Sequence, residues 1–137
     1  MEKMKFKFLE HTADIKFLAR GRTLNEVFEN CVLAFSNYVS RGGKIKSPLK
    51  KIIKLGGEDN ESLLYQLMDA LIYLIDAEDF VASKAKVKIS GKKLEAVVHG
   101  DKTSSYRGLD HVKAATYAEM HVKQLKAGWE AQVVLDV

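Results

Sequence analysis

Hydrophobic and polar residues alternate with two different periods along the chain. Two short apolar stretches near the start, at 5–10 and 15–20, are separated by a polar HTAD segment, which predicts two strands joined at a polar corner. Apolar residues then recur at steps of three and four over 24–38, which is typical of a helix with one buried face. Thr23 and Glu26 have the spacing of a capping box, so we expect this helix to begin directly after Thr23.

A second helix is predicted after the acidic segment at 58–61. Asp59 is placed to cap its first N–H groups, and capping explains the local acidity without a metal. The apolar face over 63–75 is unusually wide, so we expect this to be the more deeply buried of the two helices. A strand is predicted before it at 52–55, after a loop at 40–48 that holds two glycines and the only proline.

The pattern changes to a period of two after residue 83. Lys84, Lys86 and Lys88 alternate with apolar residues, which predicts a half-exposed strand with one cationic face. The SGKK segment at 90–93 predicts a turn that returns the chain in a hairpin. Lysines on an outer strand commonly block edge pairing, so a solvated strand face is the favoured interpretation of this charge.

The rest of the chain is also expected to be extended. A polar loop is predicted at 100–110, followed by strands within 111–125 and 129–137, with the C-terminal strand inside the fold. This order of elements predicts an α+β fold in which two helices pack on mainly antiparallel β-sheet. With 137 residues there is no room for a second core of comparable size, so we expect a single compact domain over 1–137.

Composition excludes several classes of protein. Hydrophobic residues make up 47% and charged residues 29%, which is unlike an intrinsically disordered chain. The only cysteine, Cys31, is expected in the core, and with no CxxC pair neither an intramolecular disulfide nor a zinc ribbon is predicted. No apolar run is long enough for a membrane span and the start lacks a signal-peptide pattern, so we expect a cytoplasmic protein without a membrane partner.

Motifs for common enzyme chemistry are missing from the sequence. It contains no GxGxxG, GxxxxGK[ST], GxSxG or HExxH, and its four histidines lack metal-ligand spacing. The remaining candidates are acidic: Asp14 precedes an apolar strand, and Asp136 is followed only by Val137 with its terminal carboxylate. Such oxygens suit hard cations such as Ca²⁺ and Mg²⁺. Spacing alone nevertheless favours a turn-capping role for Asp14 and a solvated position for Asp136.

Several stretches in the same order resemble the archease family. They are FLEHTADI at 8–15, TLNEVFENCVLAF at 23–35, GEDNESLLYQLMDALIYLID at 57–76, VKAATY at 112–117 and WEAQVVLDV at 129–137. The resemblance implies a protein that is not itself an enzyme but activates an RtcB-type RNA ligase in tRNA splicing and RNA repair. It implies that the protein promotes guanylylation of the ligase histidine by GTP and permits multiple turnover. This protein is then expected to contact RNA only indirectly, through the ligase.

The same resemblance implies a divalent-metal site. Matched to the family's motifs, its ligands are Asp14, Asp136 and Val137, with Ca²⁺ as the first expectation and Mg²⁺ or Mn²⁺ as alternatives. His11 and Lys113 flank the motifs, and both a structural role and contact with nucleotide or ligase stay open for them. At residue 118, where the family often has histidine, this chain has alanine, so no role of that histidine carries over. The sequence makes no prediction of the oligomeric state.

Two further functions compete with this one. A direct RNA-binding or chaperone-like module is suggested by the isoelectric point of about 9.1 and by the three alternating lysines. A net charge of +4 is too small to establish RNA binding, and the aromatic residues fall mostly in apolar stripes rather than on a stacking platform. A metal-dependent hydrolase would need a nucleophile-activating site, for which the sequence offers no candidate.

Overall fold

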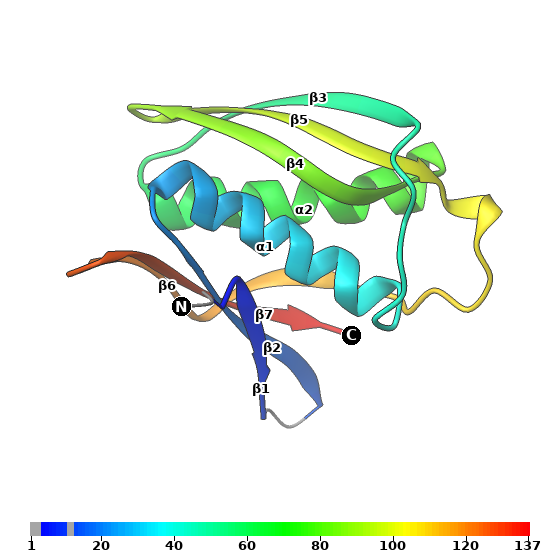
Figure 1. Ribbon diagram of the computed structural model, residues 1–137, viewed down its shortest axis with the longest axis horizontal. Coiled ribbons are helices and arrows are strands. Elements are labelled where there is room, and N and C mark those ends of the chain that lie inside the picture. Colours follow the sequence, from blue (N-terminus) through cyan, green and yellow to red (C-terminus); the bar gives the residue numbers. More distant parts are fainter. Residues whose placement is uncertain (1–3, 11–12) are drawn as a thin grey trace.

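Two antiparallel sheets enclose both helices in the computed structural model, which describes residues 4–10 and 13–137 (Figure 1). In chain order the elements are β1 (Phe6–Leu9), β2 (Asp14–Gly21), α1 (Leu24–Val39), β3 (Leu49–Gly56), α2 (Asn60–Glu78), β4 (Phe80–Ser90), β5 (Lys93–Lys102), the short 3-10 helix η1 (Thr103–Ser105), β6 (Ala114–Leu125) and β7 (Gly128–Asp136). The predicted α+β class with two helices and antiparallel strands is confirmed.

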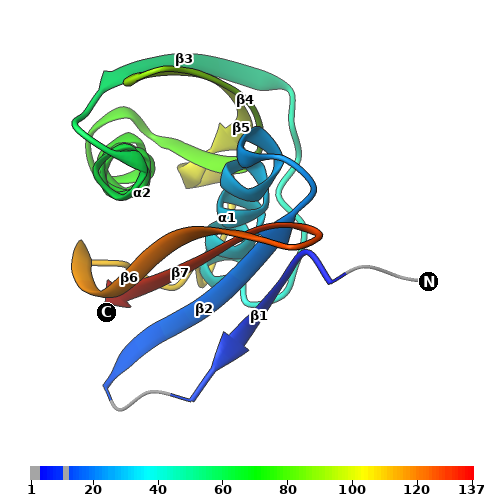
Figure 2. The same cartoon turned by 90° about the vertical axis from the view of Figure 1, so that its left-hand side faces the viewer.

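The strands divide into a four-stranded sheet of order β1-β2-β7-β6 and a three-stranded sheet of order β3-β5-β4. Figure 2 shows the two helices in the layer between them. The sequence predicted the strands but not this division. In the four-stranded sheet β7 lies between β2 and β6, so the expected inside position of the C-terminal strand is confirmed.

The first helix begins as its sequence predicts. The Thr23 hydroxyl accepts a hydrogen bond of 3.1 Å from the N–H of Glu26. The Glu26 carboxylate reaches back to the N–H of Arg22 at 2.7 Å, one residue before the cap. Asp59 likewise caps α2, with its carboxylate 2.8 Å from the N–H of Ser62. Both helix starts therefore satisfy N–H groups that have no partner within the helix.

The expectation that α2 is the more deeply buried helix is wrong. α1 packs against β4 on one side and against β2 and β7 on the other and has no exposed residue, whereas α2, between β6 and the β3 and β4 strands at the side of the layer, keeps one exposed side. Burial on two sides extends to polar residues of α1: Asn30 is 6% exposed, and its amide donates a hydrogen bond of 2.6 Å to the carbonyl of Arg20. By contrast, Tyr73 of α2 is 58% exposed. A wide apolar stripe thus predicted contact with the core, but not which helix lies at the centre.

The β4–β5 hairpin has the predicted faces. Val87 pairs with Ala96 and Ile89 with Leu94, and these side chains point toward the helices, while the alternating lysines are exposed.

Helix side chains also accept hydrogen bonds from N–H groups on the edges of the sheets, where no neighbouring strand is present to accept them. Glu29 and Asn25 of α1 accept from N–H groups of β4, and Glu61 of α2 accepts from an N–H of β6.

One hydrophobic core joins both helices to both sheets. Its largest fully buried side chains include Phe17, Phe28 and Phe35. Cys31 is fully buried among them, as predicted, and burial raises the pKa of its thiol. A buried thiol held in its neutral form behaves as a small apolar side chain rather than as a nucleophile.

Candidate functional site

Asp14 and Asp136, far apart in the sequence, are direct cross-strand partners at the ends of β2 and β7. Side chains of directly opposed residues in an antiparallel pair lie on the same face of the sheet. Their neighbours Ile15 and Leu135 are also paired, and Leu135 is fully buried in the core between the sheets. The two aspartates therefore lie on the outer face, away from the helices, where Asp136 is exposed and Asp14 is half-buried.

A third segment meets the same corner. Ala114, at the start of β6, is the cross-strand partner of Asp136 on its other side. The N–H of Lys113 donates a hydrogen bond of 2.8 Å to the main-chain oxygen of Asp136. Val137 follows directly and is half-buried. Asp14 of the HTAD motif, Ala114 of VKAATY and Asp136 of LDV thus converge at one end of the four-stranded sheet.

The donor chemistry of this corner suits a hard divalent cation. It offers two carboxylates and the main-chain oxygen of Val137, the oxygen ligands that Ca²⁺ and Mg²⁺ prefer. No cluster of three or more histidine, cysteine, aspartate or glutamate side chains with metal-binding geometry occurs in residues 4–10 and 13–137. A cation here would therefore rely on main-chain oxygen, water or a partner for its remaining ligands. His11, the flanking candidate, lies outside the described residues.

The same outer face carries an ionic network that sequence reasoning missed, six residues along β7 from Asp136 and toward the other end of the sheet. Glu130 of β7 is almost buried, and its carboxylate meets His121 at 3.0 Å, Arg20 at 3.2 Å and Lys123 at 3.5 Å. Burial acts to raise the pKa of Glu130, but these hydrogen bonds and positive charges outweigh it and hold that pKa below its ordinary value. From the sequence, the alternation within each strand shows only which residues share a face. Which of them lie opposite one another depends on the register between the strands.

A bulge in β6 lies beside this network. The register of β6 with β7 breaks between Thr116 and His121, and Glu119 within the break adopts a positive φ of 53°. Glu119 pairs with Lys16 at 2.8 Å across the outer face. Ala118, the position where the resemblance leads one to expect histidine, is exposed in this bulge. Its methyl group cannot supply a ligand or a proton carrier.

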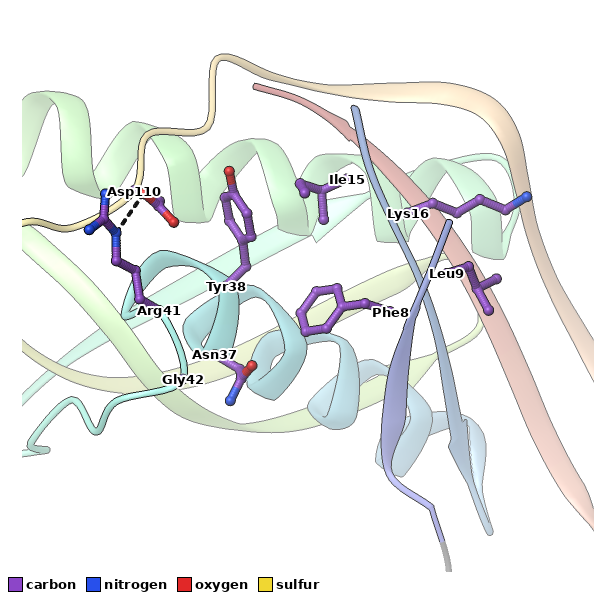
Figure 3. A pocket seen from close by; sticks show the side chains of 9 residues that line it. All are labelled: Phe8, Leu9, Ile15, Lys16, Asn37, Tyr38, Arg41, Gly42 and Asp110. Atoms are coloured by element: carbon purple, nitrogen blue, oxygen red, sulfur yellow. Dashed lines mark hydrogen bonds and ion pairs between the residues drawn. The ribbon is translucent and has the colours of Figure 1, made fainter. Parts of the chain in front are cut away.

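An open hollow of about 240 Å³ lies between the β1–β2 hairpin and the C-terminal end of α1 (Figure 3). It is lined by Phe8, Leu9, Ile15, Lys16, Asn37, Tyr38, Arg41, Gly42 and Asp110. At one end the Arg41 guanidinium contacts the Asp110 carboxylate at 2.9 Å. Burial and the Asp110 charge raise the pKa of Tyr38 against the opposing charge of Arg41, so the phenol stays protonated at neutral pH. The hollow therefore offers apolar contact, the Tyr38 hydroxyl group and the charged side chains of Lys16, Arg41 and Asp110.

The other described histidines are apart from one another. His111 approaches Asp76 at 3.8 Å, His121 binds Glu130, and His99 lies half-buried on β5. These described histidines therefore have different partners and do not form one cluster with other metal-ligating side chains. No helix in the described part of the chain combines the length and apolar character needed to cross a membrane.

Comparison with known proteins gives a consistent picture. The model of the Archease protein family matches residues 6–137. Protein archease of Methanosarcina acetivorans is 37% identical over 140 residues, covering 97% of this chain and 96% of the relative. Protein archease of Pyrococcus furiosus is 38% identical over 135 residues, covering 93% of this chain and 95% of the relative.

Solved structures agree with these sequence matches. The solution structure of protein 1598 of Methanobacterium thermoautotrophicum superposes with a TM-score of 0.82 at 33% identity, covering 97% of this chain and 99% of that one. The crystal structure of an archease from Thermotoga maritima, described as a possible chaperone, shares the fold with a TM-score of 0.63 at 20% identity over the whole of both chains. By its sequence motifs, its fold and these matches, the chain belongs to the archease family.

Proposed function

We propose that this protein activates an RtcB-type RNA ligase in tRNA splicing and RNA repair. It promotes guanylylation of the ligase's active-site histidine by GTP and allows the ligase to turn over many times. The ligase carries out the bond chemistry, and this protein is its cofactor. The family match supports the proposal, and the observation that carries it is the direct pairing of Asp14 with Asp136 on an uncovered sheet face.

The proposed working part is the corner formed by Asp14, Asp136 and Val137, which together bind a divalent cation. Ca²⁺ is the first candidate because it accepts carboxylate and main-chain oxygens in flexible numbers, and Mg²⁺ and Mn²⁺ are the alternatives. When bound, such an ion supplies positive charge that phosphate oxygens can share. The main-chain bond from Lys113 to Asp136 holds the end of β7 against β6, so the carboxylate of Asp136 starts from a fixed backbone.

Pre-organisation is the physical reason for placing this site on paired strands. Carboxylates of directly opposed residues in a ladder lie on one face and close enough to bind one cation together. In the proposed site the sheet therefore supplies two oxygen ligands from a fixed backbone. Because Asp136 is exposed, the bound ion would remain accessible to a partner.

The decisive experiment is single-turnover labelling of the cognate ligase with radiolabelled GTP. We expect the wild-type protein to raise the yield of ligase–GMP, and Asp14→Ala and Asp14→Asn to abolish the rise. Asp69→Ala removes an exposed carboxylate from the surface of α2 and is the matched control, which should activate as the wild type does. Normal activation by both Asp14 variants would contradict the metal-site mechanism. Failure of the wild type with an active ligase would contradict ligase activation altogether.

A further inference from the structure

The three-stranded sheet presents one face that no other element covers. Both helices pack on its inner side, and in Figure 1 strands β3, β5 and β4 form an outer layer. Six lysines point outward from this layer and define the basic face: Lys50, Lys54, Lys84, Lys86, Lys88 and Lys93.

The register shows that these lysines share one face. Lys54 of β3 and Lys88 of β4 are the two cross-strand partners of Glu95, from opposite sides of the central strand β5. Lys50 and Lys84 flank His99 in the same way. The basic face therefore has lysines along both outer strands, about 6 to 7 Å apart where they are two residues apart on one strand.

The charge of this face is not neutralised. Glu95 lies between Lys54 and Lys88, and none of the six lysines forms an ion pair with any part of the chain that the structure describes. Some lysines elsewhere do have such partners, as Lys16 with Glu119 and Lys51 with Glu78. These six positive charges outnumber the net charge of +4 for the whole chain. Positive charge gathered on one face without neutralising partners attracts a polyanion.

Protection of sheet edges does not account for all of these lysines. Lysine on an edge strand prevents pairing with another chain. The edge of β4, however, is already occupied by the side chains of Glu29 and Asn25, which bind its N–H groups at 2.8 and 2.9 Å. Lys93 lies on the central strand, where there is no edge to protect. Edge protection and solvation therefore do not explain all six lysines, and binding to a partner would explain the rest.

We propose that the basic face binds the phosphate backbone of RNA directly and without reading its sequence. Lysines act as point charges toward phosphate oxygens. The outward positions of β3, β5 and β4 hold no phenylalanine, tyrosine, tryptophan or arginine, the residues that are enriched in protein interfaces. Ile52 is the one large apolar side chain exposed there, too little for insertion into a bilayer. Without stacking residues, recognition rests on charge alone. This goes beyond activation of the ligase, in which RNA is met only indirectly.

Fluorescence anisotropy with a labelled RNA hairpin of arbitrary sequence tests the proposal, at salt from about 50 to about 200 mM. The variant Lys54→Glu/Lys86→Glu/Lys88→Glu reverses three charges on the basic face. A matched control, Lys7→Glu/Lys44→Glu/Lys126→Glu, makes the same change in net charge at exposed lysines elsewhere. A milder variant with glutamine at 54, 86 and 88 covers the case that glutamates beside Glu95 prevent folding, which circular dichroism checks.

The wild type should bind the hairpin with an affinity that falls steeply with salt and changes little when the sequence is scrambled. Loss of three phosphate contacts should lower the affinity by roughly tenfold or more and reduce the salt slope by about 2 to 3. The control should bind nearly as the wild type does. Equal losses in both charge variants, or no binding by the wild type at low salt, would overturn the proposal. So would binding to phosphatidylserine vesicles but not to RNA, which would identify a membrane surface instead.

The outcome is separable from the activation of the ligase. GTP labelling of the ligase needs no RNA, so the basic-face variant should still stimulate it. Loss of RNA binding with normal guanylylation would assign the two activities to opposite sides of the molecule.

Discussion

The carboxylate of Glu29 on α1 accepts a hydrogen bond of 2.8 Å from the N–H of Val87, on the edge of β4. The side chain of Asn25 accepts from the N–H of Ile89 in the same way. Two N–H groups on the edge of β4 are thus bonded by one helix. A helix side chain here takes the place of a fourth strand. The contact joins the centre of the helical layer to the sheet that carries the basic face.

Replacing Glu29 tests this contact. Glu29→Ala leaves the N–H of Val87 without its acceptor and should lower the free energy of unfolding by roughly 1 to 3 kcal/mol. Glu29→Gln retains an acceptor oxygen and should lose less than the alanine variant. Urea denaturation measures both. If the two variants are equally stable, the hydrogen bond to the strand edge contributes nothing.

Glu130 makes stability depend on pH in the acid range. Its folded-state pKa lies below the ordinary 4.5, because the hydrogen bonds from His121 and Arg20 outweigh the effect of burial. A carboxyl group with a lowered folded pKa stabilises the protein above its unfolded pKa, and that contribution is lost as pH falls through the folded value. We expect Glu130→Gln to be less stable by roughly 1 to 3 kcal/mol near pH 7. The difference should shrink below pH 4.5.

Denaturation of wild type and Glu130→Gln over a series of pH values provides the measurement. A difference that stays constant down to the acid limit would show that the carboxylate's charge is not what the network stabilises. Glu78→Gln is a useful comparison, since it changes the ion pair with Lys51, in which the carboxylate side chain is 37% exposed, and should cost well under 1 kcal/mol.

Gly100 occupies a position on β5 where a side chain does not fit. A Cβ atom there would meet the carbonyl oxygen of Val81 and lie 2.8 Å from Cζ of the buried Phe80 ring. Gly100→Ala must therefore displace backbone or a packed ring and should destabilise by roughly 1 to 3 kcal/mol or more. Gly56→Ala in the same sheet is the control, because its Cβ would meet its nearest neighbour at an ordinary 3.7 Å. Equal melting temperatures for the two variants would refute the steric argument.

Local signals in the sequence predicted the elements well. The capping residues Thr23 and Asp59 and the alternation after residue 83 act within a few residues of the chain, and the structure confirms each. The central position of α1 did not follow from the width of its apolar stripe, because burial on two sides depends on which sheets enclose the helix.

Long-range contacts escaped prediction for the same reason. The bulge at Glu119, the network at Glu130 and the contact of Glu29 with the edge of β4 join residues distant in sequence, and no periodicity encodes them. For the candidate site, the sequence placed Asp14 and Asp136 at strand ends. Their direct pairing required the neighbour relation of β2 and β7, which is a property of the topology. Likewise, six lysines became one basic face only through the register of three strands.

Cation binding at the Asp14–Asp136 corner should be measurable without any ligase. A ligand that binds only the folded state raises its stability, by about 2.7 kcal/mol when present at about one hundred times its dissociation constant. We therefore expect Ca²⁺ to raise the melting temperature of the wild type by several degrees after treatment with a chelator, and Mg²⁺ or Mn²⁺ to do so less. Asp136→Asn removes an exposed carboxylate without changing its shape and should abolish the rise, whereas Asp69→Asn should retain it. An identical rise in wild type and Asp136→Asn would place the cation elsewhere, and no rise with any of the three ions would leave the two aspartates as a feature of the sheet alone.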